Sequence, residues 1–282
     1  MSSPILPPEL EREIFERTAY MCPQDISSLF LVSQRVNEWI AGIRYRTVTP
    51  NGVHSSCPFR VLQRAIQSNS RPLSFFRAHV RHVVMSYSCI RDETSETVEQ
   101  VFSAFSGIQH FVFTQQLAPF LLPVLASLRP RRFQAGFDPQ LFVDTQLCES
   151  IFTCLTHLAL WNLTSSMSDP SRCLSFFACT PSLTHLLIND AFDMVPHILA
   201  ASESLQVLID YDTVDTGSAL DDAGSDDRFV LMENRGGLGE GNQGRIDYWA
   251  RADLFVAKKW RGEIKPKTRC WIEKADNIPG YP

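Results

Sequence analysis

The sequence predicts an α/β protein in which short N-terminal helices precede a short, irregular solenoid of strand-and-helix repeats. One observation behind this fold class is a short apolar motif that recurs through much of the chain. The other is that segments with helical periodicity lie between the copies of the motif. Stacked repeats of this kind place their strands on the concave face and their helices on the convex face.

The motif is clearest where Leu-Thr-His-Leu occurs twice, from Leu155 and from Leu183. It holds an apolar residue, two others, a second apolar residue, one other, and usually a third apolar residue. Copies begin at Val80, Ile108, Pro130, Leu155, Leu183 and Leu205, at spacings of 28, 22, 25, 28 and 22 residues. A repeat of roughly 20 to 29 residues that contains one strand and a returning helix is typical of leucine-rich repeats.

Helices are predicted between these strands, at residues 94–106, 116–128, 138–152, 169–180 and 191–201. Two of them open with Asp-Pro, at Asp138 and Asp169, which offers an N-cap acceptor beside a proline suited to the first turn. A further helix at residues 245–262 is expected to cap the last repeat. Seven aspartates with Gly and Ser predict a solvated acidic loop at residues 210–227.

Strand alternation predicts which side chains face outward on the concave sheet. The third position of each motif forms one outward column: His82, His110, Arg132, His157, His185, Val207 and Arg228. The fifth position forms a largely apolar column, Val84, Val112, Gln134, Ala159, Leu187, Ile209 and Val230, which Trp161 and Tyr211 flank.

An exposed apolar and aromatic row is typical of an interaction surface. The residues predicted to contact a target protein are His110, His157, Trp161, His185 and Tyr211. Two alternatives stay open at this point. The histidines can serve only to keep an exposed strand position polar, or the C-terminal segment or the acidic loop can fold over the row.

Charge and composition exclude several classes of partner. With 26 basic and 31 acidic residues the net charge is −5, which provides no overall basic field for nucleic acid or anionic lipid. The N-terminus lacks the pattern of a signal peptide, and the most apolar window, residues 117–128, is too short to span a bilayer. The expectation is a soluble protein of the cytoplasm or nucleus, without nucleic acid or membrane as partner.

Metal binding and catalysis have little support in the sequence. Eight cysteines form no C-x-x-C pair, which favours reduced, buried thiols over a zinc site. The segment GEGNQG (239–244) matches the glycine pattern of dinucleotide-binding loops, but five residues separate it from the preceding strand and little chain follows for further βαβ units. We therefore expect no enzyme, no cofactor and no metal; dinucleotide binding by this segment is the enzymatic alternative.

The N-terminal residues 5–40 have helical periodicity, with the stretches ILPPELEREIFERT and DISSLFLVSQRVNEWI. These two stretches resemble an F-box. The resemblance implies a three-helix domain at residues 1–48 that binds a Skp-type adaptor, and through it a cullin, while residues 49–282 select a target. It assigns adaptor contacts to Leu6, Pro7, Leu10, Ile14, Phe15, Leu29, Leu31 and Val32. The segment ERTAYMCPQD (16–25) departs from the family pattern, because it is longer than the usual turn.

The function implied is that of a substrate receptor in an SCF-type cullin-RING ubiquitin ligase. The alternative is a repeat scaffold for protein–protein interaction without a ligase, whose N-terminal helices cap the solenoid. The two hypotheses differ in the burial of Leu10, Ile14 and Leu29, because these are core residues in the scaffold hypothesis.

Overall fold

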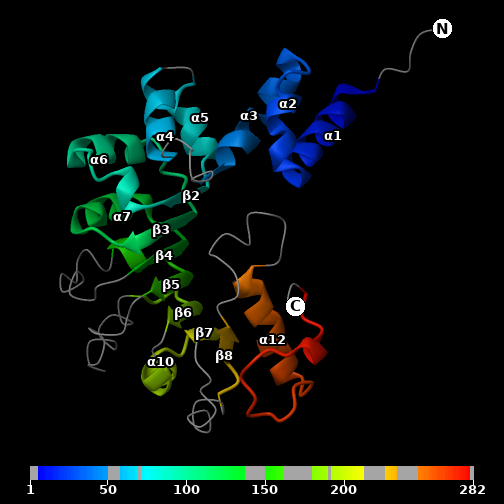
Figure 1. The fold of residues 1–282 in the computed structure, drawn as a ribbon, viewed down its shortest axis with the longest axis vertical. Coiled ribbons are helices and arrows are strands. Elements are labelled where there is room, and N and C mark those ends of the chain that lie inside the picture. Colours follow the sequence, from blue (N-terminus) through cyan, green and yellow to red (C-terminus); the bar gives the residue numbers. More distant parts are fainter. Residues whose placement is uncertain are drawn as a thin grey trace. The chain divides into compact units, whose positions relative to one another are not determined.

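The computed structural model describes residues 6–49, 58–68, 71–136, 150–161, 180–189, 192–212, 226–233 and 247–279. The chain divides into two compact units, Met1–Phe111 and Val112–Pro282. The division falls within strand β3 (His110–Gln116), so the first unit holds more than the expected module of residues 1–48. Figure 1 labels the helices and strands of both units.

Helices at the start of the first unit agree with the periodicity of the sequence. They are α1 (Pro8–Met21), the 3-10 turn η1 (Pro23–Asp25), α2 (Ile26–Leu29) and α3 (Gln34–Arg46). Helix α1 begins at Pro8, and proline suits this position because the N–H groups of a first turn have no partner within the helix and proline has none. The helix ends at Met21, two residues before Pro23. The Ser33 side chain caps α3 by accepting a hydrogen bond from the Val36 N–H.

The same unit continues with β1 (Thr47–Val48), α4 (Pro58–Gln67), α5 (Leu73–His79), β2 (His82–Met85), η2 (Tyr87–Cys89) and α6 (Ser95–Ser103). Strand β1 pairs in parallel with β2. Helices α3 and α5 pack closely because Gly42 has no side chain, and a Cβ at this position would collide with the ring of His79. The helix expected at residues 94–106 is confirmed, with Thr94 as its cap.

The second unit alternates strands with helices. Beyond the rest of β3 it holds η3 (Pro119–Leu121), α7 (Leu122–Leu128), β4 (Arg132–Gly136), β5 (His157–Trp161), β6 (His185–Asn189), η5 (Phe192–Met194), α10 (Val195–Ala201), β7 (Val207–Asp212), β8 (Phe229–Glu233), α12 (Tyr248–Trp260) and η7 (Lys274–Asp276). Strands β4 to β8 pair in parallel, and the strand order of the sheet follows the chain from β1 to β8.

The register of the sheet confirms the repeat motif. Arg132 pairs with His157, His157 with His185, and His185 with Val207, so the third position of one motif lies beside the third position of the next. The fourth and sixth positions are buried, as Leu158 and Leu160 in β5 show. The alternation predicted from the sequence is therefore present, with these side chains in the core.

Two helix predictions need comment. Residues 116–118 are not helical, because β3 continues to Gln116. Proline is tolerated in the first turn of a helix but not in its interior, and Pro119 and Pro123 lie in the first turns of η3 and α7. The predicted helices at 138–152 and 169–180, with the caps Asp138 and Asp169, lie almost wholly outside the described residues. The glycine-rich segment 239–244 also lies outside them.

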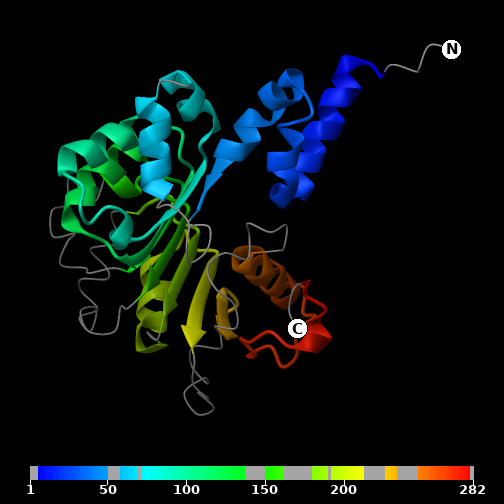
Figure 2. The ribbon, with the colours of Figure 1, turned by 45° about the horizontal axis from the view of Figure 1, so that its top comes forward.

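Helix α12 does not cap the end of the repeat array as expected. It packs on the face of the sheet formed by the apolar column Ala159, Leu187, Ile209 and Val230, against which it buries Trp249, Ala252, Phe255 and Val256. Figure 2 shows this helix, in orange, on the side of the strands opposite α7 and α10. The prediction was wrong because it gave the outward apolar column no cover, and burial of these four side chains under a helix stabilises the position observed.

The segment after α12 closes the edge of the sheet instead. The N–H of Leu231 in β8 donates to the carbonyl of Cys270 over 2.7 Å, and Leu231 forms a parallel bridge with Trp271. An edge strand otherwise presents unpaired backbone groups that invite pairing with another chain. The residues around Cys270 therefore perform the capping that the sequence assigned to the helix.

The acidic loop expected at residues 210–227 is wrong at its beginning. Residues 210–212 belong to β7, and Asp210 is fully buried at the sixth motif position. At the other end, Asp226 pairs with Arg228 at 2.8 Å and Asp227 with Lys267 at 3.6 Å. Residues 213–225 lie outside the described part of the chain.

Candidate interaction surfaces

Large apolar side chains are exposed on the N-terminal helices. We define the N-terminal apolar surface as Leu6, Leu10, Ile14, Leu31 and Val32, which are 52, 48, 51, 87 and 57% exposed. Leu10 and Ile14 lie four residues apart and so share one face of α1. Burying such a side chain is worth about 1.5–3 kcal/mol, so a group of them left in water is typical of a binding surface.

The eight residues assigned to adaptor contact separate into two groups. Six are exposed: Leu6, Pro7, Leu10, Ile14, Leu31 and Val32. The other two, Phe15 and Leu29, pack against the small core of these helices, which Ala19, Val36 and Ile40 form. The scaffold hypothesis placed Leu10, Ile14 and Leu29 in the core. The exposure of Leu10 and Ile14 contradicts that placement, whereas Leu29 packs against the core as the hypothesis requires.

Met21 extends this surface and was missed from the sequence. It is 73% exposed and follows Ile14 by seven residues, two full turns of α1, so it lies on the same face. The spacing of seven was the available signal. It went unused because the family resemblance assigns no contact to this position.

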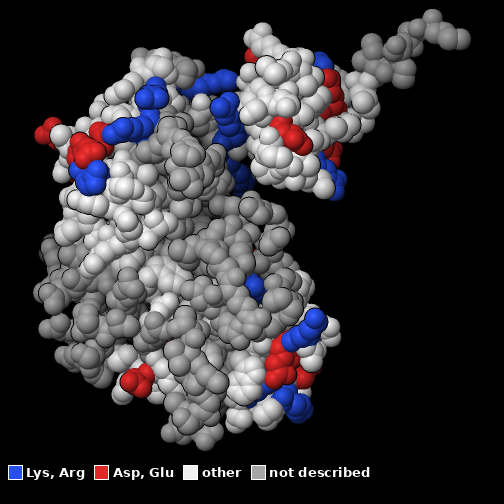
Figure 3. Space-filling view, viewed as in Figure 1, with Lys and Arg blue, Asp and Glu red and all other residues white. Residues whose placement is uncertain are grey.

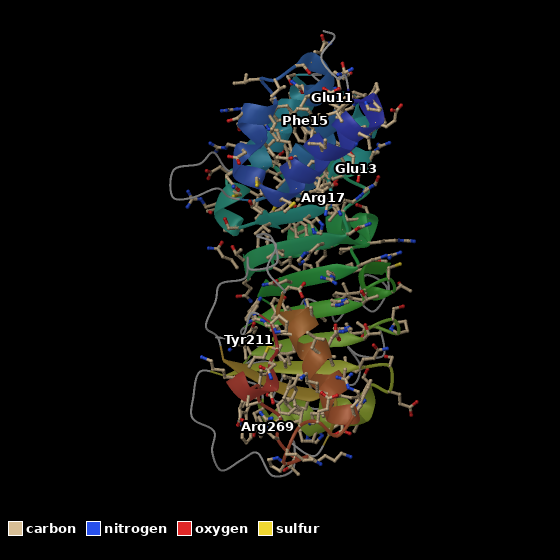
Figure 4. The ribbon with its side chains drawn as sticks, turned by 90° about the vertical axis from the view of Figure 1, so that its right-hand side faces the viewer. Glu11, Glu13, Phe15, Arg17, Tyr211 and Arg269 are labelled. Carbon is tan, nitrogen blue, oxygen red and sulfur yellow. The ribbon has the colours of Figure 1, made fainter. Side chains whose placement is uncertain are left out.

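Charged residues hold α1 against α3 beside the apolar surface. Arg35 forms an ion pair with Glu11, and its guanidinium lies 5.0 Å from the centre of the Trp39 ring. The negative charges of Glu9 and Glu11, in the first turn of α1, interact favourably with the positive end of the helix dipole. Figure 4 labels Glu11, Glu13, Phe15 and Arg17 along this helix.

The predicted target-binding row is largely covered in the second unit. The rings of His157 and His185 stack at 4.1 Å, and both meet the edge of Trp249 in α12. Trp161 stacks on Tyr211 at 5.8 Å, and Tyr211 is only 6% exposed. The expectation of an exposed row is therefore wrong for these four residues, and the alternative that the C-terminal segment folds over them is confirmed.

His110, the fifth predicted contact, lies in the first unit. It begins β3 and is half-buried, with its ring edge-to-face against His82 at 5.8 Å. The structure therefore separates His110 from the set that α12 covers.

The repeated Leu-Thr-His-Leu has a structural explanation. Both starting leucines, Leu155 and Leu183, are fully buried. The Thr184 hydroxyl donates to the carbonyl of Thr156 at 3.1 Å, and the Thr156 hydroxyl donates to the carbonyl of Arg131 at 3.0 Å. The Thr156 hydroxyl also lies 2.9 Å from Nδ1 of His157, and the Thr184 hydroxyl lies 2.8 Å from Nδ1 of His185. The threonines thus tie one repeat to the one before, and the histidines face α12.

Polar contacts fix α12 at both ends. At its start, Asp247 accepts from the Ala250 N–H at 2.8 Å and forms an ion pair with Arg132 at 3.2 Å. Along its length, Asp253 lies 2.8 Å from Nε2 of His185, and at its end the Lys259 ammonium donates to the carbonyl of Asp226. Figure 4 shows the helix lying across the strands near Tyr211.

Tyr248 completes this arrangement at the start of α12. Its hydroxyl donates to Oε1 of Gln134 at 3.3 Å, and its ring meets Tyr211. Burial raises the pKa of the Tyr248 phenol, so the hydroxyl keeps its hydrogen at neutral pH.

A buried ion pair organises the segment after α12. Arg269 donates to both carboxylate oxygens of Asp276 at 2.9 and 2.6 Å, and its guanidinium lies 5.9 Å from the Phe255 ring. Burial alone would raise the pKa of Asp276, but hydrogen bonds from Arg269 and the Glu273 N–H outweigh it, so the pKa lies below its usual value. Burial raises the pKa of the neighbouring Cys270 thiol to about 11.

The polar groups in and after α12 make contacts that hold this helix and the segment after it in place. In the part of the chain that the structure describes, no three His, Cys, Asp or Glu side chains lie close enough to share a metal ion. Within the same ranges, every helix is too short or too polar to cross a bilayer.

Comparisons with known proteins add little to this picture. Comparison with models of known protein families found no match, and comparison with curated proteins found none either. Among solved structures, the chain is similar to the leucine-rich repeat-containing protein LegL7 from Legionella pneumophila, with 15% sequence identity and a TM-score of 0.38. The similarity covers 51% of this chain and about half (52%) of that protein.

Proposed function

We propose that the protein is a non-catalytic substrate receptor that binds a Skp-type adaptor through the N-terminal apolar surface. One observation carries the proposal: residues that the F-box resemblance assigns to adaptor contact are apolar and exposed on the N-terminal helices. A module this small cannot bury them within its own core, so a partner is the natural place for them. Through the adaptor, the chain would join a cullin-RING ubiquitin ligase.

The proposed contribution to ubiquitination is proximity. A receptor that holds a target near a ligase-bound conjugate raises the effective concentration of the target lysines and supplies no chemical group itself. Of the target contacts first predicted, His185 and Tyr211 are buried. His157 is half-buried against Trp249 of α12, and Trp161 is half-buried against Tyr211. The proposal therefore places target recognition on other surfaces of residues 49–282.

A repeat scaffold without a ligase is the second candidate. The parallel strands in chain order and the closed edge of β8 support a self-contained array. In this case the N-terminal apolar surface would bind a protein other than a Skp-type adaptor. The two candidates therefore differ in the partner of a single surface.

Co-purification of the full chain with a purified Skp-type adaptor tests the proposal. Leu10→Ala combined with Ile14→Ala removes two exposed side chains from the centre of the surface. If both are contact residues, affinity falls by about 2–4 kcal/mol, roughly 30- to 1000-fold. The matched control is Leu73→Ala, which removes a leucine of similar exposure, 46%, from α5 and leaves binding unchanged.

Circular dichroism of each variant confirms that it folds. Capture by the wild type that the double variant loses supports the receptor. A folded wild type that fails to bind the adaptor leaves the scaffold as the better account.

A further inference from the structure

A long segment of the first unit carries only positive charge. Residues 39–91 contain eight arginines and neither a lysine nor an acidic residue. The net charge of −5 hides this local excess, because the acidic residues lie elsewhere in the chain. The excess is large enough to give part of the surface a positive potential.

We define the arginine surface as Arg44, Arg46, Arg71 and Arg77, from α3, from α5 and from the residues just before α5. Arg44, Arg46 and Arg77 are exposed, and Arg71 is half-buried. Among the described residues, none of the four forms an ion pair with a carboxylate. Other arginines of this unit do so, such as Arg12 with Glu16, Arg60 with Glu93 and Arg91 with Asp92.

Helices α3 and α5, which carry Arg44, Arg46 and Arg77, pack closely against each other. The ring of Tyr45 in α3 meets Phe75 and Phe76 in α5 edge-on, at 5.6 and 5.5 Å. The close approach of His79 to Gly42 fixes the same pair of helices. Figure 3 shows Lys and Arg side chains, in blue, gathered over this region of α3 and α5.

Three of the guanidinium groups lie over aromatic rings. Arg44 is 5.1 Å from the centre of the Phe30 ring and Arg71 is 5.2 Å from that of Phe75. Arg46 is 5.6 Å from the centre of the Tyr20 ring and donates to its hydroxyl at 3.1 Å. Stacking restrains a guanidinium while leaving N–H groups at its edge to donate, so less entropy is lost when an anion binds.

The arginines have an apolar neighbour. Leu73 is 46% exposed and lies four residues before Arg77, so the two share one face of α5. Guanidinium groups bind carboxylates through two parallel hydrogen bonds, and an exposed leucine adds an apolar contact. A peptide in which acidic residues alternate with apolar ones would bind both the arginines and Leu73.

We propose that the arginine surface binds an acidic segment of a partner protein, with carboxylates on the arginines and an apolar side chain against Leu73. Nucleic acid is the less favoured ligand, because the four arginines offer fewer contacts than the roughly 6–10 phosphates that a typical DNA-binding protein neutralises, and Leu73 would find no apolar partner on a phosphate backbone. The inference uses none of the N-terminal apolar surface, so it stands whether or not the adaptor binds.

Fluorescence anisotropy of the full chain tests this inference. The probe is a labelled peptide of alternating Glu and Leu, and a peptide of alternating Lys and Leu is its negative control. The double variant Arg44→Gln with Arg77→Gln is expected to weaken binding of the acidic peptide at least tenfold. The charge-matched control is Arg12→Gln with Arg17→Gln, which changes two exposed arginines of α1 outside the surface and should bind as the wild type does.

A second variant, Arg44→Lys with Arg77→Lys, keeps the charge but loses the paired hydrogen bonds. Its affinity for the acidic peptide should lie between that of the wild type and that of the glutamine variant. Thermal unfolding of each variant confirms that it folds. Failure of the wild type to bind the acidic peptide, or equal binding by the glutamine variant, overturns the proposal. Tighter binding of a single-stranded oligonucleotide or of phosphatidylserine vesicles to the same arginines also overturns it, in favour of a phosphate ligand.

Discussion

Single residues in the repeats gain their roles from neighbours that are distant in sequence. The alternation of β5 and β6 predicted that His157 and His185 point away from the repeat core, and they do. What the sequence could not show is that Trp249, more than 60 residues further along, lies against both rings. Sequence spacing therefore predicted the direction of each side chain but not what it touches.

Cys270 provides a test of burial at this scale. Burial raises the pKa of its thiol to about 11, so at pH 8 only about one molecule in a thousand carries the reactive thiolate. We expect iodoacetamide to leave Cys270 unmodified in the folded protein while it labels the exposed Cys154. Peptide mass spectrometry measures both sites. Equal labelling of the two cysteines would contradict the packing around β8.

Asp276 predicts a dependence of stability on acid pH. Its pKa in the folded protein lies below the value of an unfolded aspartate, 3.8. The ion pair with Arg269 therefore stabilises the fold fully above about pH 4 and is lost as pH falls through the lowered pKa. Chemical unfolding at a series of pH values measures this change.

Asp276→Asn is the matching variant. It should lower the free energy of unfolding at pH 7 by about 3 kcal/mol, the lower end for a broken buried pair, because Glu273 remains 3.3 Å from Arg269. Its stability should also fall less than that of the wild type between pH 5 and pH 2. Parallel pH profiles for the two proteins would show that the pair has no such role.

At the scale of elements, the strands were predicted well and the position of the last helix was not. Strands begin at the third motif position in the six copies that start from Val80 to Leu205, because alternation within a strand is a local property. The periodicity of residues 245–262 likewise revealed α12. Where α12 packs depends on contacts with β5 to β8, which no local pattern encodes. The apolar fifth column on these strands was the available signal, since four such residues on an outward face need a cover.

Trp249 tests the packing of α12. It is 4% exposed, so Trp249→Ala should lower the free energy of unfolding by about 3–5 kcal/mol, as for other large-to-small changes in a core. The control is Leu254→Ala in the same helix, where the side chain is 40% exposed and the change should stay within about 0.5 kcal/mol. Urea unfolding compares the two. Similar losses for both variants would mean that α12 is not held by its buried face.

For the whole molecule, the first unit holds both proposed binding surfaces and the second holds the array that α12 closes. Periodicity predicted the N-terminal helices, and the family resemblance assigned adaptor contacts to eight of their residues, six of which are exposed; adaptor binding itself stays a prediction. The arginine surface escaped the sequence analysis because net charge averages over the chain, while binding responds to charge on one face. A running charge count would have found residues 39–91.

Hydrogen–deuterium exchange of the full chain, with and without a purified Skp-type adaptor, tests the central claim most directly. If the N-terminal apolar surface is the docking site, the adaptor slows exchange in peptides from residues 8–32 and leaves peptides from β5 to β8 and from α12 unchanged. The exchange of α5, which carries Arg77 of the arginine surface, should also stay as it is. Protection confined to α12 or the strands, or no protection anywhere, would contradict the account.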